Sequence, residues 1–75
     1  MKRGELKKAL RKMGVLPYEY NLNGKGRKDE RLCMEFVNDE WHVYYIERGV
    51  KTTDESFASE EEACQFIYEE FLIRS

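Results

Sequence analysis

The alternation of apolar and polar residues is clearest in two runs, 31–37 and 41–47, where bulky apolar side chains recur at every second position. This two-residue period is typical of half-buried β-strands. Asn38 and Asp39 separate the runs, and both residue types tolerate the positive φ angles of a two-residue hairpin turn. A hairpin that turns there places the bulkiest side chains of both strands on one face. The predicted pairs are Leu32 with Tyr45, Met34 with Val43 and Phe36 with Trp41.

A period near 3.6 residues predicts a helix at each end of the chain, over 2–13 and 60–74. Gly14 is a suitable C-cap for the first helix, and Pro17 argues against its continuation. Ser59 followed by a glutamate three residues later predicts a capping box for the second helix. The expected buried stripes are Leu6, Ala9, Leu10 and Met13 in the first helix, and Ala63, Cys64, Ile67, Tyr68 and Phe71 in the second.

The remaining segments carry weaker patterns. Residues 18–22 form a possible extended segment, which is either a short edge strand or a stretch that tucks two tyrosines beside the hairpin. Residues 23–30 read as a polar loop with two glycines. Residues 51–58 predict a third strand whose charges place it at the exposed edge. The expected fold is a single two-layer α+β domain, helix – three-stranded antiparallel sheet – helix, with both helices on one sheet face.

Length and composition limit the possibilities further. Seventy-five residues give one domain with no room for a second core. No apolar run approaches the length of a membrane span and no signal-peptide layout is present, so we expect a soluble cytoplasmic protein with no membrane contact. Cys33 and Cys64 lie in different elements without C-x-x-C spacing, which favours two reduced thiols over a disulfide or a metal site.

The small net charge conceals a strong asymmetry along the chain. Up to Arg31 there are ten Lys and Arg against four Asp and Glu, a balance of +6, and from Leu32 onward three against eleven, a balance of −8; together these give the net charge of −2. A basic half and an acidic half offer two candidate interaction surfaces. The alternative interpretation is that each charge run is a solvated helix face.

The sequence offers few residues in an arrangement suited to catalysis. His42 is the only histidine, it lies within a predicted strand, and no Ser or Cys is its neighbour in sequence. Its spacing from the two cysteines does not suit a metal site. The basic loop 23–30 lacks the strand–loop–helix setting and the Ser or Thr of a P-loop. We therefore expect no enzymatic activity, no catalytic residue, no metal and no cofactor.

The order helix, three strands, helix is also that of double-stranded RNA-binding domains, which place basic residues at the start of their second helix. Here that position holds Glu60, Glu61 and Glu62, whose carboxylates would repel a phosphate backbone. The sequence therefore argues against nucleic acid as a partner. The alternative is a nucleic-acid binder that uses the basic first helix. Its contact residues would be Lys7, Lys8, Arg11 and Lys12.

Three segments of the second half, 32–35, 41–49 and 57–64, resemble the small immunity proteins of bacterial polymorphic toxin systems, with a match over about 32–71. The most specific piece is Tyr44-Tyr45-x-Glu47-Arg48-Gly49. The third strand is more polar here, over 52–56, than is typical of that family. Within the motif, the glycine also suits a tight turn, and the Glu-Arg pair suits a local ion pair.

The resemblance implies a protein without catalysis that binds a cognate toxin and neutralises it. An acidic surface suits the basic substrate groove of a nuclease toxin, so a nuclease is one possible target. The alternative is an interaction or regulatory domain of another system; the oligomeric state stays open. The expected contact residues all lie on the second helix, and they are Glu60, Glu61, Glu62, Phe66, Glu69 and Glu70.

Overall fold

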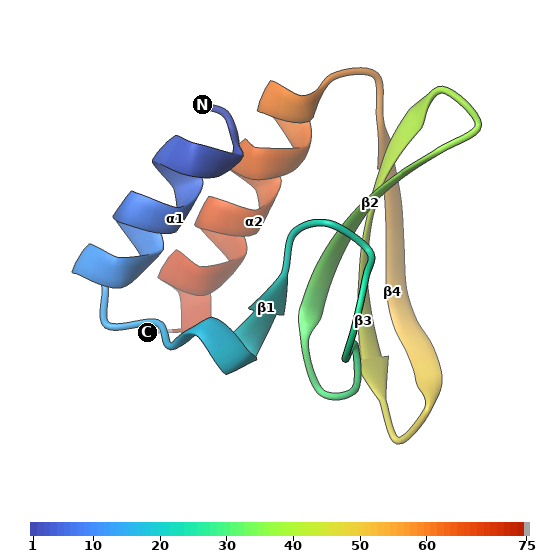
Figure 1. Ribbon diagram of the computed structural model, residues 1–75, viewed down its shortest axis with the longest axis horizontal. Coiled ribbons are helices and arrows are strands. Elements are labelled where there is room, and N and C mark those ends of the chain that lie inside the picture. The colour runs from blue at the N-terminus through green and yellow to red at the C-terminus, as the bar shows by residue number, and fades with distance from the viewer. Residues whose placement is uncertain (75) are drawn as a thin grey trace.

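The computed structural model describes residues 1–74 and has two layers, a sheet and a pair of helices that both lie on one of its faces (Figure 1). The four strands are arranged in the order β1-β2-β3-β4. The elements are α1 (Arg3–Lys12), a short 3-10 helix η1 (Pro17–Glu19), β1 (Tyr20–Asn21), β2 (Leu32–Val37), β3 (Glu40–Glu47), β4 (Val50–Phe57) and α2 (Glu60–Arg74).

The central hairpin has the predicted register. β2 and β3 are antiparallel, with Leu32 opposite Tyr45, Met34 opposite Val43 and Phe36 opposite Trp41. The turn residues Asn38 and Asp39 have φ angles of 53° and 63°. Two successive positive φ angles characterise the tight turn whose twist matches that of the flanking strands. The predicted hairpin is therefore confirmed.

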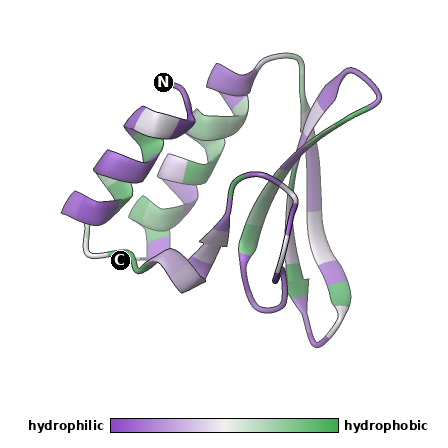
Figure 2. Cartoon of the chain, in the orientation of Figure 1, coloured by the Kyte–Doolittle hydropathy of each residue, from purple (hydrophilic) through white to green (hydrophobic). Residues whose placement is uncertain are grey.

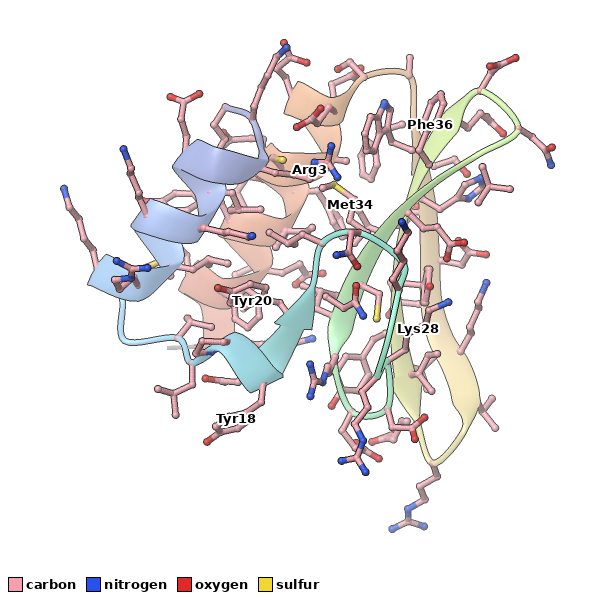
Figure 3. The ribbon with its side chains drawn as sticks, viewed as in Figure 1. Arg3, Tyr18, Tyr20, Lys28, Met34 and Phe36 are labelled. Atoms are coloured by element: carbon pink, nitrogen blue, oxygen red, sulfur yellow. The ribbon has the colours of Figure 1, made fainter. Side chains whose placement is uncertain are left out.

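The sheet differs from the prediction in one respect. It has four strands and is mixed, because β1 adds to β2 in parallel, with Tyr20 opposite Leu32 and Asn21 opposite Cys33. The α+β class holds, but the three-stranded antiparallel sheet was wrong. A strand of two residues is too short to display a period in the sequence. Tyr18 is 63% exposed and points outward, while Tyr20 turns toward the helices (Figure 3), so only one of the two tyrosines tucks in.

The segment between β1 and β2 is held by the side chain of Asn21, which is buried. Its Nδ2 donates to the backbone oxygens of Lys25 and Arg27, at 2.6 and 2.8 Å. Its Oδ1 accepts from the backbone nitrogens of Asn23 and Gly24, at 3.2 and 3.0 Å. One buried amide thus satisfies both of its polar ends and ties four positions of the loop together.

The hydrophobic core lies between the helices and the sheet. Figure 2 shows apolar residues on the inner sides of both helices and polar residues on the outer side of α1. The predicted buried stripe of each helix is confirmed, with Ala9, Met13 and Tyr68 half-buried at its margins. The buried cluster is Leu6, Leu10, Leu22, Leu32, Met34, Val43, Ala63, Cys64, Ile67 and Phe71.

The helix ends follow the sequence signals with one exception. Gly14 has a φ angle of +84°, as expected of the residue that ends α1. At the start of α2, the backbone nitrogen of Glu62 donates to Oγ of Ser59 at 3.2 Å, which confirms the N-cap. The carboxylate of Glu62 accepts from the Ser59 hydroxyl at 3.0 Å instead of from the Ser59 backbone. Only half of the predicted capping box is therefore formed.

Two isoleucines of α2 provide a matched test of this core. Ile67 is fully buried and Ile73 is 79% exposed. We expect Ile67→Ala to lower the free energy of unfolding by about 2–4 kcal/mol, because it removes buried methyl groups and leaves a cavity. Ile73→Ala should change it by less than about 0.5 kcal/mol, since surface substitutions away from special features have small effects. Chemical denaturation of both variants measures the difference, and equal losses would contradict the described packing of α2.

Candidate functional site

His42 lies on the sheet face opposite the helices, in a small polar cluster. Its Nδ1 lies 3.3 Å from Oγ of Ser56 and 3.6 Å from Oδ1 of Asp54. Its Nε2 lies 3.9 Å from Oε1 of Glu40. Ser56 is thus brought close to the histidine by pairing of β3 with β4, which sequence neighbours alone did not show.

This cluster does not have the geometry of a catalytic triad. In a triad the serine and the carboxylate bind opposite nitrogens of the imidazole, so that the ring can pass a proton between them. Here Ser56 and Asp54 approach the same nitrogen, and Glu40 Oε1 lies 3.9 Å from the other nitrogen, beyond hydrogen-bond distance. All three side chains are exposed to solvent. The arrangement is that of polar side chains on neighbouring strands.

The two cysteines are buried free thiols on different sides of the sheet. Cys64 belongs to the core under α2, while Cys33 faces away from the helices and lies near the backbone oxygens of Lys28 and Arg31. Burial raises the pKa of each thiol to about 11. Both are therefore protonated at neutral pH and poor nucleophiles. Within residues 1–74, no group of three or more His, Cys, Asp and Glu side chains is placed to hold a metal ion.

The Tyr44-Tyr45 motif forms two hydrogen bonds that tie strands and loop together. The Tyr44 hydroxyl donates to Oε1 of Glu35 at 2.7 Å, and the Tyr45 hydroxyl donates to Oε2 of Glu30 at 3.3 Å. The hydrogen bond from Tyr44, aided by nearby Lys28, holds the pKa of the Glu35 carboxyl below its usual range. The motif thus has a structural role in this chain.

The turn that follows the motif is partly as expected. Arg48 and Gly49 have φ angles of 51° and 80°, so the glycine does occupy a turn position that favours it. The backbone nitrogen of Arg48 donates to Oε1 of Glu30 at 3.0 Å. No ion pair joins Glu47 to Arg48 in the described part of the chain, so that expectation was wrong.

The six contact residues expected on α2 fall into two groups. Glu60, Phe66 and Glu70 are half-buried, whereas Glu61, Glu62 and Glu69 are exposed. Phe66 packs on Phe57 of β4, with ring centroids 5.3 Å apart. Its position is that of a core-margin residue, and it is not available as a freely exposed anchor.

Glu60 is engaged within the molecule. Its Oε2 accepts from the backbone nitrogen of Arg3 at 3.0 Å and lies 3.4 Å from Nε of the same residue. This is the ion pair that joins α1 to α2. The guanidinium of Arg3 also lies 5.6 Å from the centre of the Trp41 ring. Glu60 therefore serves to dock the two helices.

The exposed carboxylates form one stripe along α2, which we call the acidic face. Helical spacing places its members within about a third of a turn of one another. Glu62 bonds to Ser59 and Glu69 accepts from Gln65 Nε2 at 3.2 Å. No Lys or Arg among residues 1–74 forms an ion pair with these glutamates. The acidic face consists of Glu61, Glu62, Gln65 and Glu69.

Two further exposed features could contact a partner. Ile73 extends the acidic face toward the C-terminal end of α2 and is 79% exposed. At the tip of the β2–β3 hairpin, Phe36 is 54% exposed and its ring centroid lies 4.8 Å from that of Trp41 (Figure 3). The hairpin prediction placed Phe36 on the buried face, but the hairpin bends away from the helices toward its tip, as Figure 1 shows.

The basic residues expected on α1 are all exposed. Lys7 also lines a groove between α1 and β1, together with Arg3, Lys25 and Arg31. Lys8, Arg11 and Lys12 do not line it. The sequence did not single out Arg3, Lys25 and Arg31 as site residues, because they are distant from one another along the chain. The signals were the basic balance of the first 31 residues and the Gly-rich basic loop 23–30, which was set aside because it lacks the setting of a P-loop.

Comparisons with protein-family models, curated proteins and solved structures find no match to this chain. Function must therefore be argued from the geometry and from the resemblance noted in the sequence. Across residues 1–74, none of the helices has the length and apolar character needed to cross a membrane.

A near-isosteric substitution tests the electrostatics of the motif. Tyr44→Phe should raise the pKa of Glu35 toward its ordinary value, because the hydrogen bond from Tyr44 is the largest cause of the lowering. A lowered carboxyl pKa stabilises the fold above the unfolded-state value, and this contribution is lost as the pH falls through the folded-state value. The variant should therefore lose less stability on acidification than the parent.

An NMR titration of the Glu35 side-chain carboxyl measures this pKa. Tyr45→Phe is the control, since the Tyr45 hydroxyl donates to Glu30 and leaves Glu35 untouched. If both variants left the Glu35 titration unchanged, the assigned cause of its low pKa would be incorrect.

Proposed function

We propose that this chain is an immunity-type protein, which binds a cognate bacterial toxin and neutralises it without catalysis of its own. The observation that carries the proposal is the acidic face of α2, whose carboxylates have no cationic partner within the described residues. The resemblance of residues 32–71 to such immunity proteins supports the same conclusion.

The electrostatics of the acidic face favour a basic partner. Three carboxylates on one stripe repel one another, and a positively charged surface would relieve that repulsion. Complementary charge also accelerates diffusional encounter, which suits an inhibitor that must capture a toxin quickly. A nuclease toxin, with a basic groove for its substrate, is a target of this kind.

Apolar and aromatic groups near the acidic face would supply affinity. Ile73 offers exposed apolar area at one end of the stripe. At the other end, Trp41 pairs with Phe57, which lies just before α2, so the Phe36–Trp41 rings are carried close to the first turn of that helix. Aromatic residues dominate the energetics of many interfaces.

The partner itself is tested by purifying the tagged protein from lysate of its native host and identifying the protein that comes with it. We expect an equimolar complex in which the toxin is inactive. A complex with an unrelated protein through the same surface would instead favour an interaction domain of another system.

Charge reversal tests the contact surface. The triple variant Glu61→Lys, Glu62→Lys, Glu69→Lys should lower the association rate constant with the toxin by about tenfold or more at low salt, because steering is lost. Surface plasmon resonance at several salt concentrations measures this rate. The control carries the same charge change on exposed positions that do not lie on α2 or face it: Asp29→Lys, Glu47→Lys, Asp54→Lys.

The control should change the rate by about twofold or less at the same ionic strength, since its charges lie away from the proposed contact. Equal slowing in both triple variants would show that net charge alone matters and that α2 is not the contact surface.

A further inference from the structure

The groove between α1 and β1 is a concave surface that the proposed toxin contact does not use. Its volume is about 390 Å³. Its cationic wall combines Arg3 and Lys7 of α1 with Lys25 of the loop and Arg31 just before β2. We call this surface the cationic groove. The other lining residues are Gly4, Tyr20, Asn21, Leu22 and Asn23.

The charge of the cationic groove is largely uncompensated. Four cationic side chains line it and no carboxylate does. Arg3 is shared with Glu60, but Lys7, Lys25 and Arg31 form no ion pair within residues 1–74. Cations gathered without counter-charges repel one another, so an anion bound among them lowers the electrostatic free energy.

The walls of the groove are held in place before any ligand arrives. Asn21 fixes the loop through its hydrogen bond to the backbone oxygen of Lys25. Arg3 is fixed by Glu60 and by a 3.5 Å hydrogen bond from its Nη1 to the backbone oxygen of Leu22. The loop backbone and the Arg3 guanidinium are thus preorganised, which lowers the entropic cost of binding an anion there.

The first turn of α1 forms part of the wall of the groove. Arg3 and Gly4 begin this helix of ten residues, and Gly4 lines the groove with open space where a Cβ would lie. The partial positive charge of a helix N-terminus favours phosphate groups in particular. In this chain, however, the backbone nitrogen of Arg3 already donates to the Glu60 carboxylate at 3.0 Å, so the attraction of the groove comes from the side chains.

We propose that the cationic groove binds a phosphate group, of the kind carried by a nucleotide or by a single nucleic-acid strand. The guanidinium of Arg31 can present paired donors to phosphate oxygens, and Arg3 retains Nη2 beside its contacts to Glu60 and Leu22. Two lysines add point charges around them. A phosphate group has more acceptor oxygens to receive these donors than a carboxylate has. None of the residues of the acidic face lines this site, so its test is separate from the test of the proposed toxin binding.

Amide NMR and fluorescence anisotropy test this site, with sodium pyrophosphate and a short single-stranded oligonucleotide as probes. We expect both probes to shift the amide signals of Gly4, Asn23 and Lys25. If the oligonucleotide binds and pyrophosphate does not, the natural source is a strand; if both bind with similar affinity, a single phosphorylated group is enough.

Two double variants of equal charge separate the groove from general attraction. Lys7→Gln, Lys25→Gln removes groove cations, whereas Lys8→Gln, Lys12→Gln removes cations of α1 that do not line it. The groove variant should weaken binding by about tenfold and reduce the salt slope for the oligonucleotide by about 0.7 for each phosphate charge that the variant no longer neutralises. The control should retain the parental salt slope.

Three outcomes would overturn the proposal. Equal weakening in both double variants would show attraction to the whole basic side of the molecule. If a hexaglutamate peptide displaced the phosphate probes as well as they displace each other, the groove would accept any anion. If neither phosphate probe shifted the amide signals, the groove would bind no phosphate. Unchanged amide spectra of the free variants confirm that each still folds.

Discussion

The register of the β2–β3 hairpin is the constraint on which the rest of the structure depends. Because side chains alternate between sheet faces, a slip of one residue would turn Leu32, Met34 and Val43 toward solvent. The same slip would send Glu35 and Tyr44 into the core. The positive φ angles at the two turn residues fix this register locally. Both helices then have a single apolar face on which to pack.

The regular elements could be predicted from the sequence because each is long enough to display its period. The strands of the hairpin have six and eight residues and α2 has fifteen, so the spacing of their apolar residues was enough to recognise each element. β1 has only two residues, and its parallel pairing depends on the loop that Asn21 folds back. Nothing in a linear pattern shows that one asparagine satisfies four backbone groups at once.

The candidate surfaces were predictable to different degrees. Position on a helix is enough to place Glu61, Glu62 and Glu69 on one stripe, since helical geometry is regular. The half-burial of Phe66 depends on the rotation of α2 over Phe57, which is a tertiary property. The cationic groove joins residues from the start of α1 to the start of β2, so only the fold reveals it.

Arg3 connects the two oppositely charged surfaces. Its Nε lies 3.4 Å from Glu60 at the start of α2, while its Nη1 donates to Leu22 on the groove side. An anion in the cationic groove would compete with Glu60 for this guanidinium, because each binds the same positive charge. Weakening that ion pair would leave the negative charge of Glu60 less compensated. Glu60 precedes Glu61 and Glu62 of the acidic face. The ion pair that docks α1 against α2 therefore also lies between the cationic groove and the acidic face.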